Sequence, residues 1–324
     1  MKVYNEFVSK KLNSHLQKEL LKIREKRNFN PQKYIIKKAN LLNDYMNEYN
    51  LKSCVVAVSG GIDSAIVLGI VKEAMNKKSS PIKKVVSLLM PVYNEGATNQ
   101  DKATTRGITV CNKFKFEPVI IDLTKHQELL RNHIDKEVKI KGEAWASGQV
   151  VAYLRTPTIY YTTSLLSQEG LNPIFCGTTN RDEGAYLGYF GKASDGMVDV
   201  QLISDIHKNE VFAVAKELNV PQEIIETIPA GDMYDGREDE EVFGAPYDFV
   251  EFYLNFKNLS EKEQTKIVDS LDEETKNQFK RYSNNLENLH NYNKHKYLGC
   301  SPAVHLDILE SKVKGGWKYY NYEK

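Results

Sequence analysis

Short, continuous apolar runs alternate with helical patterns across the middle of the chain. The runs are CVVAV (54–58), KVVSLLMPV (84–92), PVIIDL (118–123) and PIFCG (173–177). The clearest helical segments between and beside them span about residues 63–76, 98–113 and 148–168. Uninterrupted apolar strands between helices are typical of a parallel sheet covered on both faces. The pattern therefore predicts an α/β fold with a doubly wound parallel sheet.

Helical sequence flanks this core on both sides. Before residue 50, apolar residues such as Leu12, Leu16 and Leu20 recur at helical spacing. After about residue 247 the chain becomes charged and helical, and Ser260 with Glu263 forms a capping-box pattern. No repeat, low-complexity linker or Pro/Gly/Ser-rich boundary interrupts it. We therefore predict one domain over 1–324, with a helical N-terminal segment (1–50), a catalytic core (51–254) and a helical C-terminal tail (255–324).

Composition narrows the class of protein. The chain is 41% hydrophobic and 27% charged with a net charge of +1, which is ordinary for a globular protein and argues against a nucleic-acid or membrane surface. Basic residues between Lys10 and Lys38 are mixed with acids and asparagines, which favours a solvated helical face. The four cysteines form no CxxC pair, and we find neither a signal-peptide pattern nor a long apolar run. We expect a reduced, cytoplasmic setting.

The segment VVAVSGGIDSAIVLG (55–69) holds the strongest chemical signal. It places SGGIDS where a core strand passes into a helix, and ligands of open parallel sheets bind at that edge. The two glycines allow backbone N–H groups to converge on an anion, and Ser59 and Ser64 add hydroxyl donors. Asp63 would repel an anion unless a cation bridges them, so the pattern indicates Mg²⁺ with a pyrophosphate-like group. The alternative is a plain glycine turn with Asp63 as a helix cap.

This loop is neither GxxxxGK[ST] nor GxGxxG. It resembles the SGGxDS loop of the ATP pyrophosphatase superfamily, which implies an adenine nucleotide alpha hydrolase-like fold and cleavage of ATP to AMP and pyrophosphate. GMP synthetase, asparagine synthetase and tRNA-modifying enzymes share that loop. A second block, FCGTTNRDEGAYLGYFGKASDGMVDVQLISDIHKNEVFAVAKELNVPQEII (175–225), resembles NAD synthetases of the ammonia-dependent type, as does DGREDEEVFGAPYDFVEFYL (235–254).

The resemblance implies a ligase that amidates deamido-NAD through an acyl-adenylate, with ATP as co-substrate and Mg²⁺ as cofactor. The residues it assigns to ATP are Ser59, Gly60, Gly61, Asp63, Ser64, Thr178 and Lys208, the last just inside a helix that starts at about His207. The residues it assigns to Mg²⁺ are Asp63 and Glu183. The residues it assigns to the acid substrate are Arg155, Lys192, Asp199, His295 and Lys296. We expect Asp195 to orient or deprotonate incoming ammonium.

Each of these assignments has a simpler alternative. Lys208 and Glu210 would also suit a plain helix N-terminus, Lys192 and Asp199 a surface ion pair, and Asp195 a turn beside a glycine. The pair His295 and Lys296 would suit a solvated tail. Tyr189 and Phe190 would stack on the nicotinate ring or pack in the core.

The sequence departs from the family pattern at two places. Tyr153 stands where the family usually has the first arginine of an Arg-x-Arg pair, and Pro157 predicts that the helix starts later or bends there. Ala230 and Gly231 stand where the family commonly has a hydroxyl for ATP, and Asp232 is a candidate replacement.

These departures leave a second enzyme open, an ATP-dependent amide-forming ligase for a different carboxylic acid. A nucleotide-binding homologue without catalysis is a third alternative. The 58 residues before Ser59 contain one cysteine, Cys54, inside a predicted strand. We therefore expect no glutaminase domain. We expect free ammonia or a separate partner to supply the nitrogen. The resemblance also implies a homodimer.

Overall fold

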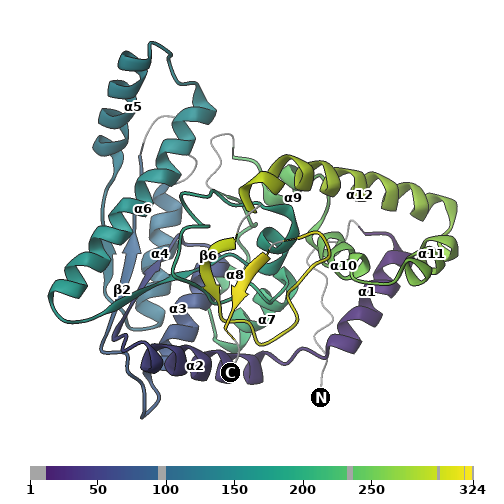
Figure 1. Ribbon diagram of the computed structural model, residues 1–324, viewed down its shortest axis with the longest axis horizontal. Helices are drawn as coiled ribbons and strands as arrows, with labels where there is room; N and C mark the ends of the chain where they lie inside the picture. The colour runs from purple at the N-terminus through teal and green to yellow at the C-terminus, as the bar shows by residue number, and fades with distance from the viewer. Residues whose placement is uncertain (1–11, 94–99, 232–235, 298–299, 317, 323–324) are drawn as a thin grey trace.

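The computed structural model describes residues 12–93, 100–231, 236–297, 300–316 and 318–322 (Figure 1). Within these ranges seven strands form one sheet in the order β3-β2-β1-β4-β5-β6-β7, and every neighbouring pair is parallel. The strands are β1 (Ser53–Ala57), β2 (Lys84–Leu89), β3 (Pro118–Ile120), β4 (Pro173–Gly177), β5 (Val200–Gln201), β6 (Cys300–His305) and β7 (Lys318–Asn321). The predicted parallel α/β fold is confirmed.

Helices cover both faces of this sheet. Cys54 and Val56 of β1 point into a core shared with one group of helices, whereas Val55 points into a core shared with α6. The first group is α2 (Pro31–Glu48), α3 (Ile62–Met75), α4 (Gln100–Lys113) and α7 (Lys208–Glu217), and α6 (Ala144–Gln168) lies on the opposite face beside α5 (Thr124–Val138). The alternation along β1 explains the continuous apolar run, because both faces are buried.

A second core joins the two ends of the chain. Leu16 and Leu20 of α1 (Ser14–Arg27) are buried with the aromatic face of α10 (Tyr247–Lys257). Figure 1 shows these helices at the right, opposite the arm of α5 and α6. The remaining helices are α8 (Gln222–Ile225), α9 (Asp239–Phe243), α11 (Glu261–Ser270), α12 (Glu273–Asn293), the π-helical turn η1 (Glu183–Leu187) and the 3-10 turn η2 (Lys294–Tyr297).

Several local predictions were right and others were wrong. Ser260 and Glu263 form the predicted capping box of α11. The C-terminal tail is not wholly helical, because β6 and β7 extend the sheet past β5. Helix α6 starts at Ala144 and continues through Pro157, so the later start was wrong. The proline leaves the carbonyl of Tyr153 without its helical donor, and Tyr153 is 45% exposed, where water can bond to that carbonyl.

The basic N-terminal stretch is not a simple solvated face. Arg24 and Lys38 are buried, and Arg27 is mostly buried in an ion pair. None of the helices in the described ranges has both the length and the apolar content that a membrane span requires. Cys54, Cys111 and Cys176 are buried free thiols, as expected of small apolar residues in a core.

Candidate active site

The loop between β1 and α3 forms a compact hydroxyl cluster. Ser59 Oγ lies 3.1 Å from Ser64 Oγ, and the Ser64 hydroxyl donates to the carbonyl of Gly61 at 3.0 Å. The Gly61 N–H points to Ser59 Oγ at 3.3 Å. These contacts fold the loop over the N-terminus of α3, where backbone N–H groups without helical partners attract anions.

Gly60 is required by this geometry. Its φ of +81° lies in the left-handed region, and a Cβ there would collide with the carbonyl oxygen of Ala103 in α4. Arg106, also in α4, donates to the Gly60 carbonyl at 3.0 Å. Helix α4 therefore packs against the loop and fixes the backbone at Gly60.

Two carboxylates from distant parts of the chain meet beside this loop. The side-chain amide of Asn180 donates to Asp63 Oδ1 at 2.9 Å and to Glu183 Oε1 at 2.7 Å. Asn180 Oδ1 in turn accepts the Glu183 N–H at 3.1 Å, at the start of η1. Asp63 is in the first turn of α3, and Asn180 follows β4, so adjacent strands deliver both groups to the same edge of the sheet.

Lys208 connects the same two carboxylates. Its ammonium donates to Asp63 Oδ2 at 2.8 Å and to Glu183 Oε1 at 2.9 Å, although the Lys208 side chain is only 1% exposed. The hydroxyl of Tyr247 lies within hydrogen-bond distance of Glu183 Oε1, at 3.0 Å, and of Asp239 Oδ2, at 2.7 Å. The site therefore has three carboxylates around one ammonium.

Carboxyl groups outnumber cations in this arrangement. Burial alone would lower the pKa of Lys208, but Asp63, Glu183 and Asp239 outweigh burial and raise it, so the ammonium stays charged. Burial raises the pKa of Glu183, and the charges of Asp63 and Asp239 act in the same direction while Lys208 opposes them. A further cation would relieve this repulsion.

The donor set fits Mg²⁺ supplied together with a nucleotide. No group of three or more His, Cys, Asp or Glu side chains suited to a metal occurs in the described ranges. Mg²⁺ is commonly bound by one or two carboxylates together with substrate phosphates. Asp63 and Glu183 are 21% and 15% exposed, so both are accessible beside the loop.

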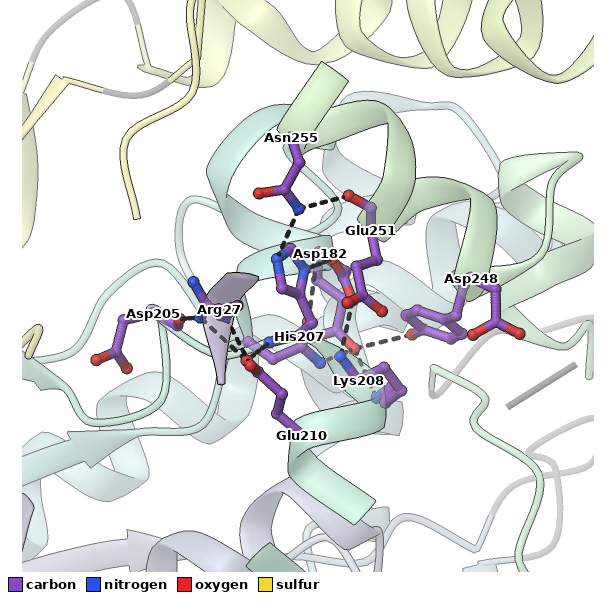
Figure 2. A network of polar contacts seen from close by, with 12 residues as sticks. Arg27, Asp182, Asp205, His207, Lys208, Glu210, Asp248, Glu251 and Asn255 are labelled. Carbon is purple, nitrogen blue, oxygen red and sulfur yellow. Dashed lines mark hydrogen bonds and ion pairs between the residues drawn. The ribbon is translucent and has the colours of Figure 1, made fainter. Parts of the chain in front are cut away.

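The N-terminus of α7, which carries Lys208, is held by Asp182. The carboxylate of Asp182 accepts the Lys208 N–H at 2.7 Å and contacts His207 Nδ1 at 2.6 Å (Figure 2). Asn255 of α10 donates to His207 Nε2 at 3.2 Å. Burial lowers the pKa of His207 well below its usual range, so the ring is neutral, with its proton on Nδ1.

Three of the residues assigned to substrate or ammonium lie near one another. Arg155 and Lys296 both act electrostatically on Asp195, which is exposed in its loop. Arg155 Nε donates to the carbonyl of Met90 at 3.3 Å. Lys296 donates to the carbonyls of two residues of the neighbouring loop, Gly188 at 3.0 Å and Phe190 at 2.8 Å.

Others are placed differently. Lys192 and His295 are exposed, and His295 Nδ1 contacts the Tyr292 carbonyl. Asp199 accepts the Phe175 N–H at 2.7 Å and a hydroxyl from Tyr160, contacts that link β4, β5 and α6. No ion pair joins Lys192 to Asp199 among the described contacts.

The aromatic pair and Thr178 also have defined positions. Thr178 is half-buried after β4. Phe190 is buried, as expected for packing in the core, whereas Tyr189 packs edge-on against Phe243 and donates to Asp239.

A family model described as NAD synthase matches residues 34–298. The chain belongs to the NAD synthase family. The NH(3)-dependent NAD(+) synthetase of Alkaliphilus oremlandii is 30% identical over 244 residues, which cover 74% of this chain and 91% of that protein. The enzyme of the same name from Mycoplasmopsis pulmonis is 32% identical over 245 residues, covering 72% and 87%.

Solved structures share the fold. NMN synthetase from Francisella tularensis superimposes with a TM-score of 0.65 at 24% identity, covering 83% of this chain and 96% of that one. NH3-dependent NAD synthetase from Campylobacter jejuni gives a TM-score of 0.58 at 22% identity, with the same coverage.

The structure adds site residues that the sequence interpretation missed. Asn180, Tyr247 and Asp239 bond directly to the predicted metal ligands or to each other. All three lie inside the two blocks that resemble NAD synthetases. Their polar side chains within those blocks were the feature of the sequence that could have identified them. Of the two departures from the family pattern, Tyr153 donates to Gln149 on the surface of α6. Gly231 donates its N–H to Asp239, and Asp232 lies outside the described residues.

Proposed function

We propose that this member of the NAD synthase family amidates deamido-NAD with free ammonia, consuming ATP through an acyl-adenylate. The observation that carries the proposal is the convergence of Asp63, Glu183 and Lys208 beside the SGGxDS loop. Relatives that cover most of the chain bear the name NH(3)-dependent NAD(+) synthetase.

The residues of the loop would bind the ATP phosphates. Backbone N–H groups at Gly60 and Gly61, the hydroxyls of Ser59 and Ser64, and the half-buried Thr178 supply neutral donors. Lys208 would exchange one carboxylate contact for a phosphate oxygen. Asp63 and Glu183 would hold Mg²⁺, which neutralises charge on the phosphates.

The acid substrate would lie beyond the metal site, toward Arg155 and Lys296. Its nicotinate carboxylate would attack the α-phosphate of ATP and release pyrophosphate, and ammonia would then displace AMP from the acyl-adenylate. Lys192, Asp199 and His295 remain predicted contacts to this substrate. Asp195 would attract ammonium near the reacting carbonyl and accept its proton.

Exposed apolar side chains on and between α5 and α6 support a homodimer. They include Leu129 (74%), Val138 (58%) and Tyr161 (66%). Ile140 (68%) lies between the two helices, and Trp145 (57%) is in the first turn of α6. Large apolar side chains mark an interface where they adjoin one another on a surface. We propose that these side chains contact a second copy of the chain, and that the protein acts in the cytoplasm. Sedimentation of the protein with Leu129→Glu should then give a monomer where the unsubstituted chain gives a dimer.

A panel of acids tests the substrate. Purified protein with ATP, Mg²⁺ and ammonium should form amide from deamido-NAD. Tyr153 in place of an arginine favours one alternative, a ligase for a different acid, because tyrosine lacks the charged fork that binds anions. Preferential turnover of nicotinic acid mononucleotide, or of an acid without a nicotinate ring, would establish that alternative. Tight ATP binding with no turnover of any acid would indicate a homologue without catalysis.

A further inference from the structure

Two arginines of α1 reach the catalytic elements from outside the family match. Arg24 and Arg27 are one helical turn apart and precede residue 34, where the match to the NAD synthase family begins. The apolar residues of α1, Leu16 and Leu20, anchor this helix against α10. The two arginine side chains are only 2% and 12% exposed.

Arg27 spans the segment that leads into Lys208. Its guanidinium donates to Glu210 Oε1 at 2.6 Å, to Glu210 Oε2 at 3.0 Å and to the carbonyl of Asp205 at 2.5 Å (Figure 2). Glu210 Oε2 also accepts the N–H of His207 at 2.9 Å, which closes the capping box of α7. Arg27 therefore fixes both sides of the helix N-terminus on which Lys208 is the first residue.

Arg24 holds the neighbouring helix, α10. It donates to Asp248 at 2.7 Å and to Glu251 at 2.6 Å, and both carboxylates are buried. Asp248 directly follows Tyr247, whose hydroxyl bonds to Glu183. The same helix supplies Asn255, which bonds to the ring of His207 beside Lys208. One face of α1 thus contacts two elements that contribute donors to Glu183, namely α7 with Lys208 and α10 with Tyr247.

We propose that α1 positions the nucleotide and metal site, with Arg27 as the positioning residue for Lys208. The proposal rests on the proposed function, because it takes Lys208 as an ATP ligand. A planar guanidinium can bond to a carboxylate and a carbonyl at once, which an ammonium cannot do in the same geometry. We call the contacts of Arg27 with Glu210 and with the Asp205 carbonyl the Arg27 clamp. The N-terminus of α7, and with it Lys208, would shift when this clamp is removed.

The test compares three variants of the full chain. Arg27→Ala removes the clamp, Arg27→Lys keeps only its charge, and Lys26→Ala is the control on the exposed side of α1. Calorimetry measures the Kd of ATP with Mg²⁺, and steady-state kinetics measures KM for ATP and for the acid. We expect Arg27→Ala to raise the ATP Kd about tenfold, the lower end of the effect of residues that support metal ligands. Arg27→Lys should raise the ATP Kd by an intermediate factor. Lys26→Ala should leave the ATP Kd within about twofold of that of the unsubstituted protein. The KM for the acid should stay within about twofold in all three variants.

A purely structural role predicts a different result. In that case the Tm falls while the Kd of ATP stays constant, or both KM values rise together, and either outcome overturns the proposal. Because Arg27→Ala leaves the buried Glu210 without its partner, it can fail to fold. Arg27→Lys then decides, and an ATP Kd within about twofold of normal refutes the clamp.

A double-mutant cycle with Glu210→Gln makes the test sharper. The effects of Arg27→Ala and Glu210→Gln on the ATP Kd should be much less than additive, because each removes the same ion pair. Full additivity contradicts the proposal. If the unsubstituted protein binds no ATP, the proposed function fails, whereas normal binding in all Arg27 variants rejects only the role of α1.

Discussion

Lys208 and Asp63, 145 residues apart in the chain, form an ion pair of 2.8 Å at the carboxyl edge of the sheet. The strand order explains how they meet. Asp63 follows β1, which pairs with β4, and β4 in turn pairs with β5, which precedes α7 and Lys208. The buried ammonium thus offsets part of the negative charge of the carboxylates that we assign to Mg²⁺. Binding of Mg²⁺ and ATP would release it toward phosphate.

The first prediction concerns these carboxylates. Asp63→Asn and Glu183→Gln should each lower turnover at least about a hundredfold, because each removes a charged ligand from the cation that stabilises transition-state charge. Steady-state AMP formation measures the effect, and Glu73→Gln, on the exposed side of α3, is the control. Near-normal turnover in a folded Glu183→Gln protein would show that the second metal ligand is misplaced.

The second prediction compares two glycines that both have positive φ. Gly170→Ala should cost about 1 kcal/mol in unfolding free energy, from its left-handed backbone alone, because nothing lies within 4 Å of the added Cβ. Gly60→Ala has the same backbone penalty and also a collision with α4. We expect Gly60→Ala to lose most ATP binding while Gly170→Ala keeps it. Equal ATP affinity in the two variants would mean that the loop is not the phosphate site.

The third prediction concerns the nitrogen donor. An amine with a pKa of roughly 9 is mostly protonated at pH 7, so the enzyme must bind ammonium and remove a proton or use the small neutral fraction. Asp195→Asn should raise the KM for ammonium more than the KM for ATP. An exposed acid on α4 provides the control, Asp101→Asn. Unchanged ammonium dependence in Asp195→Asn would remove Asp195 from the mechanism.

The fourth prediction is a pH dependence of stability. Burial lowers the pKa of His305 to about 3, with Lys38 acting in the same direction and Asp205 opposing it. The unfolded chain therefore binds a proton at His305 as the pH falls below about 6.5, whereas the folded chain does not. The stability owed to the neutral ring is complete above pH 6.5 and is lost below it, by about 1.4 kcal/mol per pH unit.

Urea unfolding at pH 7.5 and 5.5 measures this difference. The gap in unfolding free energy between the unsubstituted protein and His305→Asn should shrink by about 1.4 kcal/mol at the lower pH. Groups common to both proteins cancel in that comparison. His133→Asn, at an exposed position of α5, is the control substitution. A constant gap for His305→Asn would mean that the His305 ring takes up a proton equally in the folded and the unfolded chain, which would contradict the lowered pKa.

The sequence predicted local features better than distant partnerships. Strand β1, its loop and α3 follow from a single stretch of apolar residues, glycines and hydroxyls, so their positions were predicted closely. Strand β5 has two residues, and β6 and β7 follow a charged helical region, so neither length nor apolar pattern revealed them.

Burial of charge was the other limit. Arg24 and Arg27 look like solvent-facing residues of a basic helix, and their partners Glu251 and Glu210 are 227 and 183 residues away. Spacing along the chain carries no information about such pairs. Asn180 was within a block that resembles the family, but its role depends on Asp63, which only the folded sheet brings near it.

The nucleotide products test the central claim most directly. Purified protein is incubated with ATP, Mg²⁺, ammonium and deamido-NAD, and nucleotides and phosphates are quantified together with the amide. We predict one AMP and one pyrophosphate for each NAD formed, and none when deamido-NAD is omitted. ADP and inorganic phosphate as the products would contradict the assignment of the loop, the two carboxylates and Lys208 to adenylation.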